Sequence, residues 1–276
     1  MQDKYGFLWI GTEEGLNRYD GIMIKSYSIC PQAAGKYISS LYGTKKNIWI
    51  GTDEGIYIYA YATETFTYFD LTTPNNVRIT SIVNHILQDK DGNLWFSTNG
   101  QGLFRYNLSK NYLEQYEFTS AFGIVASTMA DSDNQIWALT NQGESGVYKL
   151  NKAENKFEPF GLLYNAGNHH SQALAMLEDS EQTLWLGTWE CGLQKIDKYT
   201  RQTTTYLHPT DGKGVTHIHS LMEYAPHQLL IGSDDGLLLF NTLTEEYKLF
   251  TENETVPNSL SNRFVSVSYT HLTLPT

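Results

Sequence analysis

Histidines and paired carboxylates are the residues of this 276-residue chain whose types and spacing could do chemistry. His217 and His219 stand two residues apart, so on a strand they would point to the same side and could share a metal ion. A third ligand is not evident, and nothing in the sequence brings His169 and His170 near them. We therefore predict that the chain holds no metal ion.

Adjacent acidic residues invite comparison with glycosidases, which use two carboxylates at a set separation. Such pairs precede a glycine at Glu13-Glu14, Asp53-Glu54 and Asp234-Asp235. Because the acidic turn recurs along the chain, it fits a solvated turn beside glycine better than one catalytic pair. The segment 89–93, Asp-Lys-Asp-Gly-Asn, lacks the further ligands and the bidentate Glu of a calcium loop. Gly-x-Ser-x-Gly, His-Glu-x-x-His and Cys-x-x-Cys patterns are also absent, so we predict no catalytic residue and no cofactor.

Composition excludes several classes of partner. The chain has 30 acidic and 19 basic side chains and a net charge of −11, and no cluster of Lys or Arg offsets its repulsion of phosphate backbones. No apolar run approaches the roughly 18 residues of a membrane helix, and the first residues lack the pattern of a secretory signal. Cys30 and Cys191 are too few for a disulfide framework or a thiolate metal site. We expect no nucleic-acid partner and no membrane contact by this chain.

The elements that must position these side chains follow from an internal repeat. Six segments align on the pattern of residues 8–12, Leu-Trp-Ile-Gly-Thr, with spacings of 40 to 48 residues, the range of four-stranded propeller blades. One slot of the repeat, the anchor, is occupied by Trp9, Trp49, Trp95, Trp137, Trp185 and Leu230. Since one small sheet cannot bury both of its faces, we predict that the anchor side chains pack between stacked blades.

Each repeat unit divides into four predicted strands. In the third unit an apolar inner strand at 83–87 precedes the turn 89–93, and the anchor strand and a glycine-bracketed turn follow. A third strand covers 102–106, and an alternating outer strand closes the units, as at 65–69. We therefore predict an all-β protein, a β-propeller of about six four-stranded blades over residues 1–267.

The repeat resembles a known family. Its Trp-Ile-Gly-Thr block with two acidic residues and a glycine, preceded by Asp-Lys-Asp-Gly-Asn and followed by an aromatic strand, is similar to the two-component regulator propeller repeat. That repeat builds the sensor region of hybrid two-component systems of gut Bacteroidetes. There, two seven-bladed propellers precede an immunoglobulin-like domain, a membrane helix, a histidine kinase, a receiver and a DNA-binding module. The resemblance implies a periplasmic location, an oligosaccharide ligand, and a second propeller and a homodimer partner in the parent protein.

The chain departs from the plan of that family. It has six units where the family has fourteen, and too few residues precede Trp9 for an inner strand. An inner strand is predicted at 262–267, but the anchor strand that should follow it does not. Residues 268–276 fit neither the repeat nor a globular extension, as foreign or frame-shifted sequence would. We therefore predict a fragment. Its last strand, near Phe264, would close a six-bladed ring or end an open part of a seven-bladed one, and the family plan favours the open form.

Residues that contact a ligand are predicted on one face. In a propeller, the turn between the second and third strands and the loop to the next blade emerge together, where ligands usually bind. Trp189 is the one tryptophan outside the anchor slot and stands in such a turn. Its indole could stack on a sugar while nearby carboxylates and amides bond hydroxyl groups, or it could serve local packing. The predicted ligand-binding residues are Trp189, Glu190, Asn99, Gln101, Asp234, Asp235, His169 and His170.

The sequence favours a non-catalytic module that senses oligosaccharides, with a histidine kinase in the full-length parent. Two alternatives stay open. An enzyme built on the propeller, a lyase or a glycosidase, would show one blade whose carboxylates or histidines break the repeat and converge in a cavity. A scaffold that binds another protein would show an exposed apolar patch.

Overall fold

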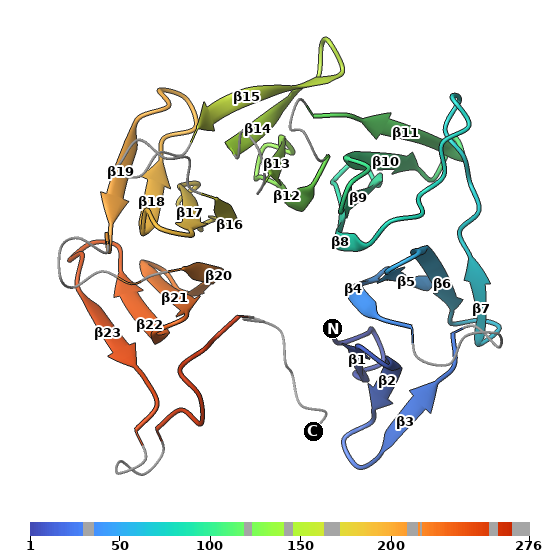
Figure 1. Ribbon diagram of the computed structural model, residues 1–276, viewed down its shortest axis with the longest axis horizontal. Coiled ribbons are helices and arrows are strands. Elements are labelled where there is room, and N and C mark those ends of the chain that lie inside the picture. Colours follow the sequence, from blue (N-terminus) through green and yellow to red (C-terminus); the bar gives the residue numbers. More distant parts are fainter. Residues whose placement is uncertain are drawn as a thin grey trace. The chain divides into compact units, whose positions relative to one another are not determined.

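Antiparallel sheets make up the regular structure of the computed structural model (Figure 1). The structure describes residues 1–29, 36–118, 123–140, 146–162, 172–208, 215, 217–253 and 259–266. Across these ranges, 23 strands form six sheets, and strands that follow one another in the chain pair side by side. We call the sheets blades 1 to 6. The described part of the chain divides into two compact units, one within residues 1–128 and one within residues 129–266.

The first unit holds blades 1 to 3. Blade 1 has three strands, β1 (Leu8–Thr12), β2 (Gly15–Tyr19) and β3 (Ile24–Tyr27). Blade 2 has four, β4 (Ile38–Gly43), β5 (Asn47–Thr52), β6 (Gly55–Ala60) and β7 (Thr65–Tyr68). Blade 3 has β8 (Val83–Gln88), β9 (Leu94–Thr98), β10 (Leu103–Asn107) and β11 (Tyr112–Tyr116).

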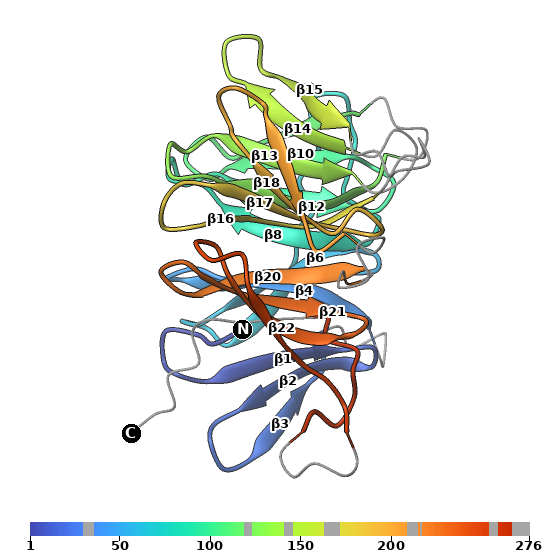
Figure 2. The ribbon, with the colours of Figure 1, turned by 90° about the vertical axis from the view of Figure 1, so that its left-hand side faces the viewer.

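The second unit holds blades 5 and 6 and most of blade 4, because the division falls inside β12. Blade 4 has β12 (Val125–Ala130), β13 (Ile136–Thr140), β14 (Gly146–Asn151) and β15 (Lys156–Leu162). Blade 5 has β16 (Ala173–Glu178), β17 (Leu184–Thr188), β18 (Leu193–Ile196) and β19 (Thr203–Tyr206). Blade 6, shown from the side in Figure 2, has β20 (Ile218–Ala225), β21 (Gln228–Ser233), β22 (Gly236–Asn241) and β23 (Tyr247–Phe250). The predicted four-stranded unit is confirmed for blades 2 to 6.

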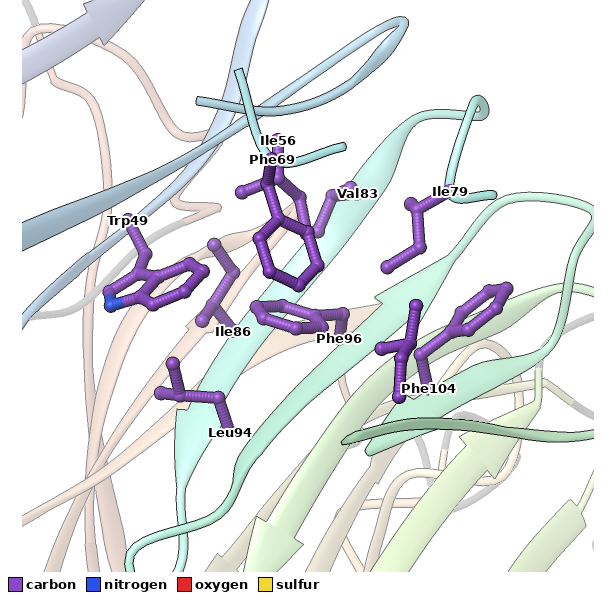
Figure 3. Close-up of a cluster of buried hydrophobic side chains, with 10 residues drawn as sticks. Trp49, Ile56, Phe69, Ile79, Val83, Ile86, Leu94, Phe96 and Phe104 are labelled. Atoms are coloured by element: carbon purple, nitrogen blue, oxygen red, sulfur yellow. The ribbon is translucent and has the colours of Figure 1, made fainter. Parts of the chain in front are cut away.

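Anchor tryptophans pack between neighbouring blades, as predicted. Trp49 of β5 lies against the blade 3 residues Val83, Ile86 and Phe96, and its ring centroid is 5.7 Å from that of Phe96 (Figure 3). Trp185 packs in the same way against blade 6. Burial of such rings, at about 25 cal/mol per Å² of apolar surface, is the main force that holds successive blades together.

The glycine two residues after the anchor lets neighbouring blades approach closely. A Cβ atom at Gly51 would lie 2.9 Å from the carbonyl oxygen of Val83, and one at Gly187 would lie 2.9 Å from that of Ile218. Only a residue without a side chain fits such contacts, which explains the Trp-x-Gly pattern. Gly232 is in the same situation, because its Cβ would lie 2.6 Å from the carbonyl oxygen of Val265.

The predicted terminal strand at 262–267 is not formed in the described part of that segment. Residues 261–266 have no strand assignment, although the Val265 N–H donates to the Ser233 carbonyl at 3.0 Å. Val265 thus contacts blade 6 in the way that the first residue of an inner strand contacts the preceding blade. A strand needs a partner with which it forms a continuous ladder, and residues 261–266 pair with no strand of the six sheets.

A buried aspartate fixes the turn before the anchor strand in four blades. The indole Nε1 of Trp95 donates to Asp89 Oδ2 at 2.8 Å, while Asp89 Oδ1 accepts the backbone N–H of Asn93 at 2.8 Å. We call this arrangement the Asp–Trp clasp. It recurs at Asp3 and Trp9, Asp131 and Trp137, and Asp179 and Trp185. The Asp89 carboxylate thus serves the turn, in line with the turn interpretation of segment 89–93.

Blade 2 lacks the aspartate and leaves its tryptophan unpartnered. Gly43 stands where the clasp needs Asp, and Trp49 Nε1 is buried with no hydrogen-bond partner. We expect Gly43→Asp to stabilise the protein by about 1 kcal/mol, because an unmet buried donor costs about 1–3 kcal/mol. The new Cβ would meet the flexible side chain of Met1 at 3.1 Å. Urea unfolding measures the gain. Trp49→Phe in the same background should abolish it, and an equal gain in both backgrounds would contradict the explanation.

Burial makes one inner-strand histidine sensitive to acid. His85 lies in β8, and burial lowers its pKa from 6.5 to about 4. The folded state therefore favours the neutral ring, so this stabilisation is complete above pH 6.5 and is lost as the pH falls toward 4. We expect it to remove about 2–3 kcal/mol of stability between pH 7 and pH 4, and His85→Gln to abolish that loss. Urea unfolding at both pH values, with His227→Gln as control, checks this; equal acid sensitivity in both variants would contradict it.

Candidate functional site

Two turns of the second unit present the side chains of the candidate site. Trp189 follows β17, and Asp234 follows β21. In each turn the hydroxyl of the last strand residue accepts a backbone N–H and donates to a glycine carbonyl: Thr188 Oγ1 bonds Gly192 O at 2.7 Å, and Ser233 Oγ bonds Gly236 O at 3.0 Å. The hydroxyls close the turns locally, so the two turn residues that follow keep their side chains for other contacts.

A bulge at the start of β20 directs two histidines to one carboxylate. The pairing of β20 with β21 places Ile218 opposite Ser233, and the register then shifts between Ile218 and Ser220. His219 is therefore the extra residue of the bulge. Its Nε2 lies 2.6 Å from Asp234 Oδ1, and the Nδ1 of His217 bonds Asp234 Oδ2. Burial alone would raise the pKa of Asp234, but the hydrogen bonds from His217 and His219 outweigh it and lower that pKa.

Trp189 completes this group by stacking on His217. The two ring centroids are 3.7 Å apart with an interplanar angle of 28°, and the His217 N–H donates to the Trp189 carbonyl at 3.0 Å. His217 has a positive φ of 44°, which is uncommon for a residue with a side chain. Phe264 lies on the other side, with its centroid 5.0 Å from that of His219. We call Trp189, His217, His219, Asp234 and Phe264 the Trp189 cluster.

The bulge residue of blade 6 behaves differently from its counterparts in the first unit. Ser39 Oγ of β4 donates to the Val83 carbonyl at 2.8 Å, and Asn84 Nδ2 of β8 donates to the Val125 carbonyl at 2.9 Å. These two residues tie one inner strand to the next. His219 instead turns to a carboxylate of its own blade. The Trp189 cluster is thus a local departure from the repeat.

The predicted ligand residues fall into separate groups. Trp189 and Asp234 are brought together through His217, Glu190 follows Trp189 in its exposed turn, and Asp235 follows Asp234. Trp189 itself is 39% exposed. His169 and His170 lie outside the described residues.

Asn99 and Gln101 belong to the first unit, in the turn after β9. The Gln101 Oε1 accepts the N–H groups of Thr80 at 2.9 Å and Ser81 at 3.0 Å, and its Nε2 donates to the Arg78 carbonyl at 2.9 Å. Its amide therefore holds a loop. Asn99 forms an isolated bridge with Ile124 and is exposed.

His217 and His219 drew attention in the sequence as possible metal ligands, without a connection to Asp234. The signal was present in the hairpin itself, since pairing Ile218 with Ser233 places residue 217 opposite residue 234. Within the described ranges, no group of three or more His, Cys, Asp or Glu side chains could hold a metal ion. The same residues include no helix long and apolar enough to cross a membrane.

A family model identifies the repeat. Residues 77–100, which include β8, the Asp89 turn and the anchor Trp95, match the model described as two component regulator propeller. The similarity to the two-component regulator propeller is thus found in residues 77–100. The resemblance predicted from the residues is confirmed, and the Asp–Trp clasp of blade 3 lies inside the matched propeller repeat.

Known proteins share this propeller fold. Histidine kinase P4 of Formosa agariphila is 24% identical over 268 residues, which cover 91% of this chain and 19% of the kinase. The extracellular domain of the putative one component system BT4673 from B. thetaiotaomicron has a TM-score of 0.78 at 24% identity, over 96% of this chain and 34% of that one. A streptogramin B lyase has a TM-score of 0.68 at 17% identity, over 92% and 82% of the two chains. The all-β propeller fold is thereby confirmed, and the chain spans about a fifth of the kinase it matches.

Proposed function

We propose that the chain is a ligand-recognition part of the sensor region of a two-component signalling protein, and that it binds oligosaccharides at the Trp189 cluster without catalysis. In this proposal the module lies outside the cytoplasm, in the periplasm. A ligand would shift the orientation of receptor subunits, with a second propeller and a homodimer partner supplied by the parent protein.

The exposed indole of Trp189 is the observation that carries this proposal. Trp189 is 39% exposed although its ring is stacked on His217, so the indole forms a rigid flat platform. Sugar rings have apolar faces that pack on such platforms, and carboxylates and imidazoles beside them bond hydroxyl groups. The family match and the likeness to an extracellular domain of a signalling system support the sensor role.

Binding measurements test the proposal. Titration calorimetry of the chain against plant and host oligosaccharides should find at least one ligand, and Trp189→Ala should weaken its binding at least tenfold. Tyr199→Ala is the matched control, because Tyr199 is an aromatic residue of the same blade, 76% exposed, beyond the other end of β18. Equal losses in both variants, or no ligand in the panel, would count against the proposal.

A propeller enzyme remains a second candidate, because blade 6 departs from the repeat as that alternative predicts. The bond of His217 Nδ1 to Asp234 is of the kind that orients a general base. The streptogramin B lyase shows that a related fold carries an enzyme. Incubation of each oligosaccharide with the chain, followed by chromatography, decides this point. New fragments that vanish in Asp234→Asn would favour the enzyme.

An exposed apolar face, the sign expected of a protein-binding scaffold, is present on blade 6. A hollow of about 610 Å³ there is lined by Leu230, Leu237, Leu239 and Phe250, among others. Leu230 occupies the anchor slot, and the anchor faces of blades 2 and 5 pack against the blade that follows.

A further inference from the structure

Asp234 determines which ring nitrogens of the Trp189 cluster carry protons. Its Oδ1 is bonded to His219 Nε2 at 2.6 Å and its Oδ2 to His217 Nδ1. An ionised carboxylate can only accept hydrogen bonds, so a proton must sit on each of these two nitrogens. A neutral imidazole has one such proton. The remaining nitrogens, Nε2 of His217 and Nδ1 of His219, are then bare acceptors.

Both bare nitrogens can be reached by a ligand. Within the described part of the chain, the two imidazole rings bond to Asp234 and to no other side chain, and neither outward nitrogen is among the buried atoms that lack a partner. The side chains of His217 and His219 are 22% and 18% exposed. A hydroxyl group that approaches the cluster can therefore donate to them.

The rings are also held in place before a ligand arrives. His217 is stacked on Trp189 and bonded to it through the backbone, and His219 lies between the Asp234 carboxylate and Phe264. Side chains that are already ordered lose little conformational entropy on binding. The strained φ of His217 at 44° is the kind of backbone cost that functional sites carry.

The charge around the cluster disfavours an anionic ligand. With both rings neutral, the Asp234 carboxylate leaves the cluster with a single negative charge. The other charged side chains on the elements that meet there are Glu190 and Asp235 in the two turns and Arg263 beside Phe264. The chain as a whole carries −11. A uronate or a sulfated sugar would therefore meet the negative charge of Asp234 and that of the chain as a whole.

We propose that the Trp189 cluster selects uncharged oligosaccharides, whose hydroxyl groups donate to His217 Nε2 and His219 Nδ1 while a sugar face covers the indole. This inference rests on the proposed oligosaccharide function and narrows its ligand class. A neutral sugar with free hydroxyl groups should therefore bind the cluster more tightly than a uronate of the same length.

Calorimetry with neutral and acidic probes tests the inference. Xylohexaose, mannohexaose and cellohexaose are the neutral probes, hexagalacturonate is the acidic one, and each is titrated into the chain at pH 7.5. We expect at least one neutral probe to bind more tightly than hexagalacturonate. Tighter binding of hexagalacturonate than of every neutral probe would overturn the inference and leave the oligosaccharide function standing. No binding of any probe would overturn both.

Two variants remove the outward acceptors and keep the inner hydrogen bonds. In His217→Asn the amide nitrogen replaces Nδ1, and in His219→Gln it replaces Nε2, so the bonds to Asp234 can persist. Each variant should weaken the neutral probe about tenfold at pH 7.5 with an unchanged melting temperature. Wild-type affinity in both would overturn the inference. If a variant melts early, the comparison of neutral and acidic probes on the wild-type chain still decides.

Discussion

Replacement of Lys198 by methionine is expected to lower the free energy of unfolding by about 3–5 kcal/mol at pH 7, because it leaves the carboxylates of Asp131 and Glu178, which are 2% and 10% exposed, without their cation. The Lys198 side chain is 4% exposed, and its Nζ lies 2.8 Å from Glu178 Oε1 and 3.0 Å from Asp133 Oδ2. Asp131, 2% exposed, is 3.8 Å away. Methionine keeps the length of the side chain and removes only the charge, so lost packing contributes little to the expected effect.

Removal of the Lys198 charge affects more than one ion pair, because its partners also take part in other contacts. Asp131 forms the Asp–Trp clasp of blade 4, and Glu178 of β16 also accepts the N–H and hydroxyl of Ser132 in the turn of blade 4. Lys198 therefore ties blade 4 to blade 5 through carboxylates that both blades use. Without the cation, the like charges of Asp131, Asp133 and Glu178 repel one another across that contact.

Urea unfolding of Lys198→Met beside Lys156→Met measures the effect, since Lys156 is an exposed lysine of β15. Burial opposes protonation of Lys198, but the hydrogen bonds to Glu178 and Asp133 outweigh it and raise its pKa. A raised pKa means that the stabilisation is complete below the pKa of an unfolded lysine and is lost as the pH rises through the folded value. The wild type and Lys198→Met should thus converge only in strong alkali. Equal effects of the two lysine variants at pH 7 would refute the assignment.

Much of the fold could be predicted because its signals repeat. The anchor slot recurs from Trp9 to Leu230, and each recurrence fixes the strands on either side of it. The strand predicted at 262–267 is wrong for its described residues. A strand depends on a pairing partner as well as on its own residues, and residues 261–266 pair with no strand of the six sheets. The apolar pattern of this segment nevertheless agrees with its position, since Val265 lies beside β21.

The candidate site was harder to predict, because it depends on a β-bulge whose position no residue type indicates. The register shift after the first residue of the inner strand leaves Ser39, Asn84 and His219 as the extra residues of blades 2, 3 and 6. A histidine in that place can reach Asp234 only because the bulge turns it toward the neighbouring turn. Trp189 was found as a departure from the repeat and Asp234 as part of a recurring acidic turn, and the contacts through His217 required coordinates.

The Asp–Trp clasp, by contrast, was readable in the sequence. An aspartate stands six residues before four of the five anchor tryptophans, and the sixth unit replaces both partners, with Tyr224 and Leu230. Such joint replacement is expected when one side chain leaves the other with an unmet hydrogen bond. Blade 2 keeps Trp49 but has Gly43 in place of the aspartate, so the indole N–H of Trp49 is buried without a hydrogen-bond partner.

Replacement of Asp179 by alanine is the second large effect, an expected loss of about 2–4 kcal/mol, because three donors lose one acceptor group. Asp179 Oδ2 accepts Trp185 Nε1 at 2.7 Å, and Oδ1 accepts the backbone N–H groups of Thr183 at 2.8 Å and Glu181 at 3.0 Å. Trp185 is 1% exposed, so water cannot take the place of the carboxylate without opening the contact between blades 5 and 6.

Asp197→Ala provides a control that separates the turn from the indole. Asp197 of the same blade also accepts two backbone N–H groups, from Tyr199 and Thr200 at 2.8 Å each, but it is exposed and bonds no tryptophan. We expect Asp179→Ala to destabilise the chain clearly more than Asp197→Ala in urea unfolding. A double-mutant cycle with Trp185→Phe isolates the indole bond, which should appear as a coupling energy of about 1–2 kcal/mol. Equal losses for the two aspartates and no coupling would show that the clasp acts only through its turn, and the stabilisation expected from Gly43→Asp would then lose its basis.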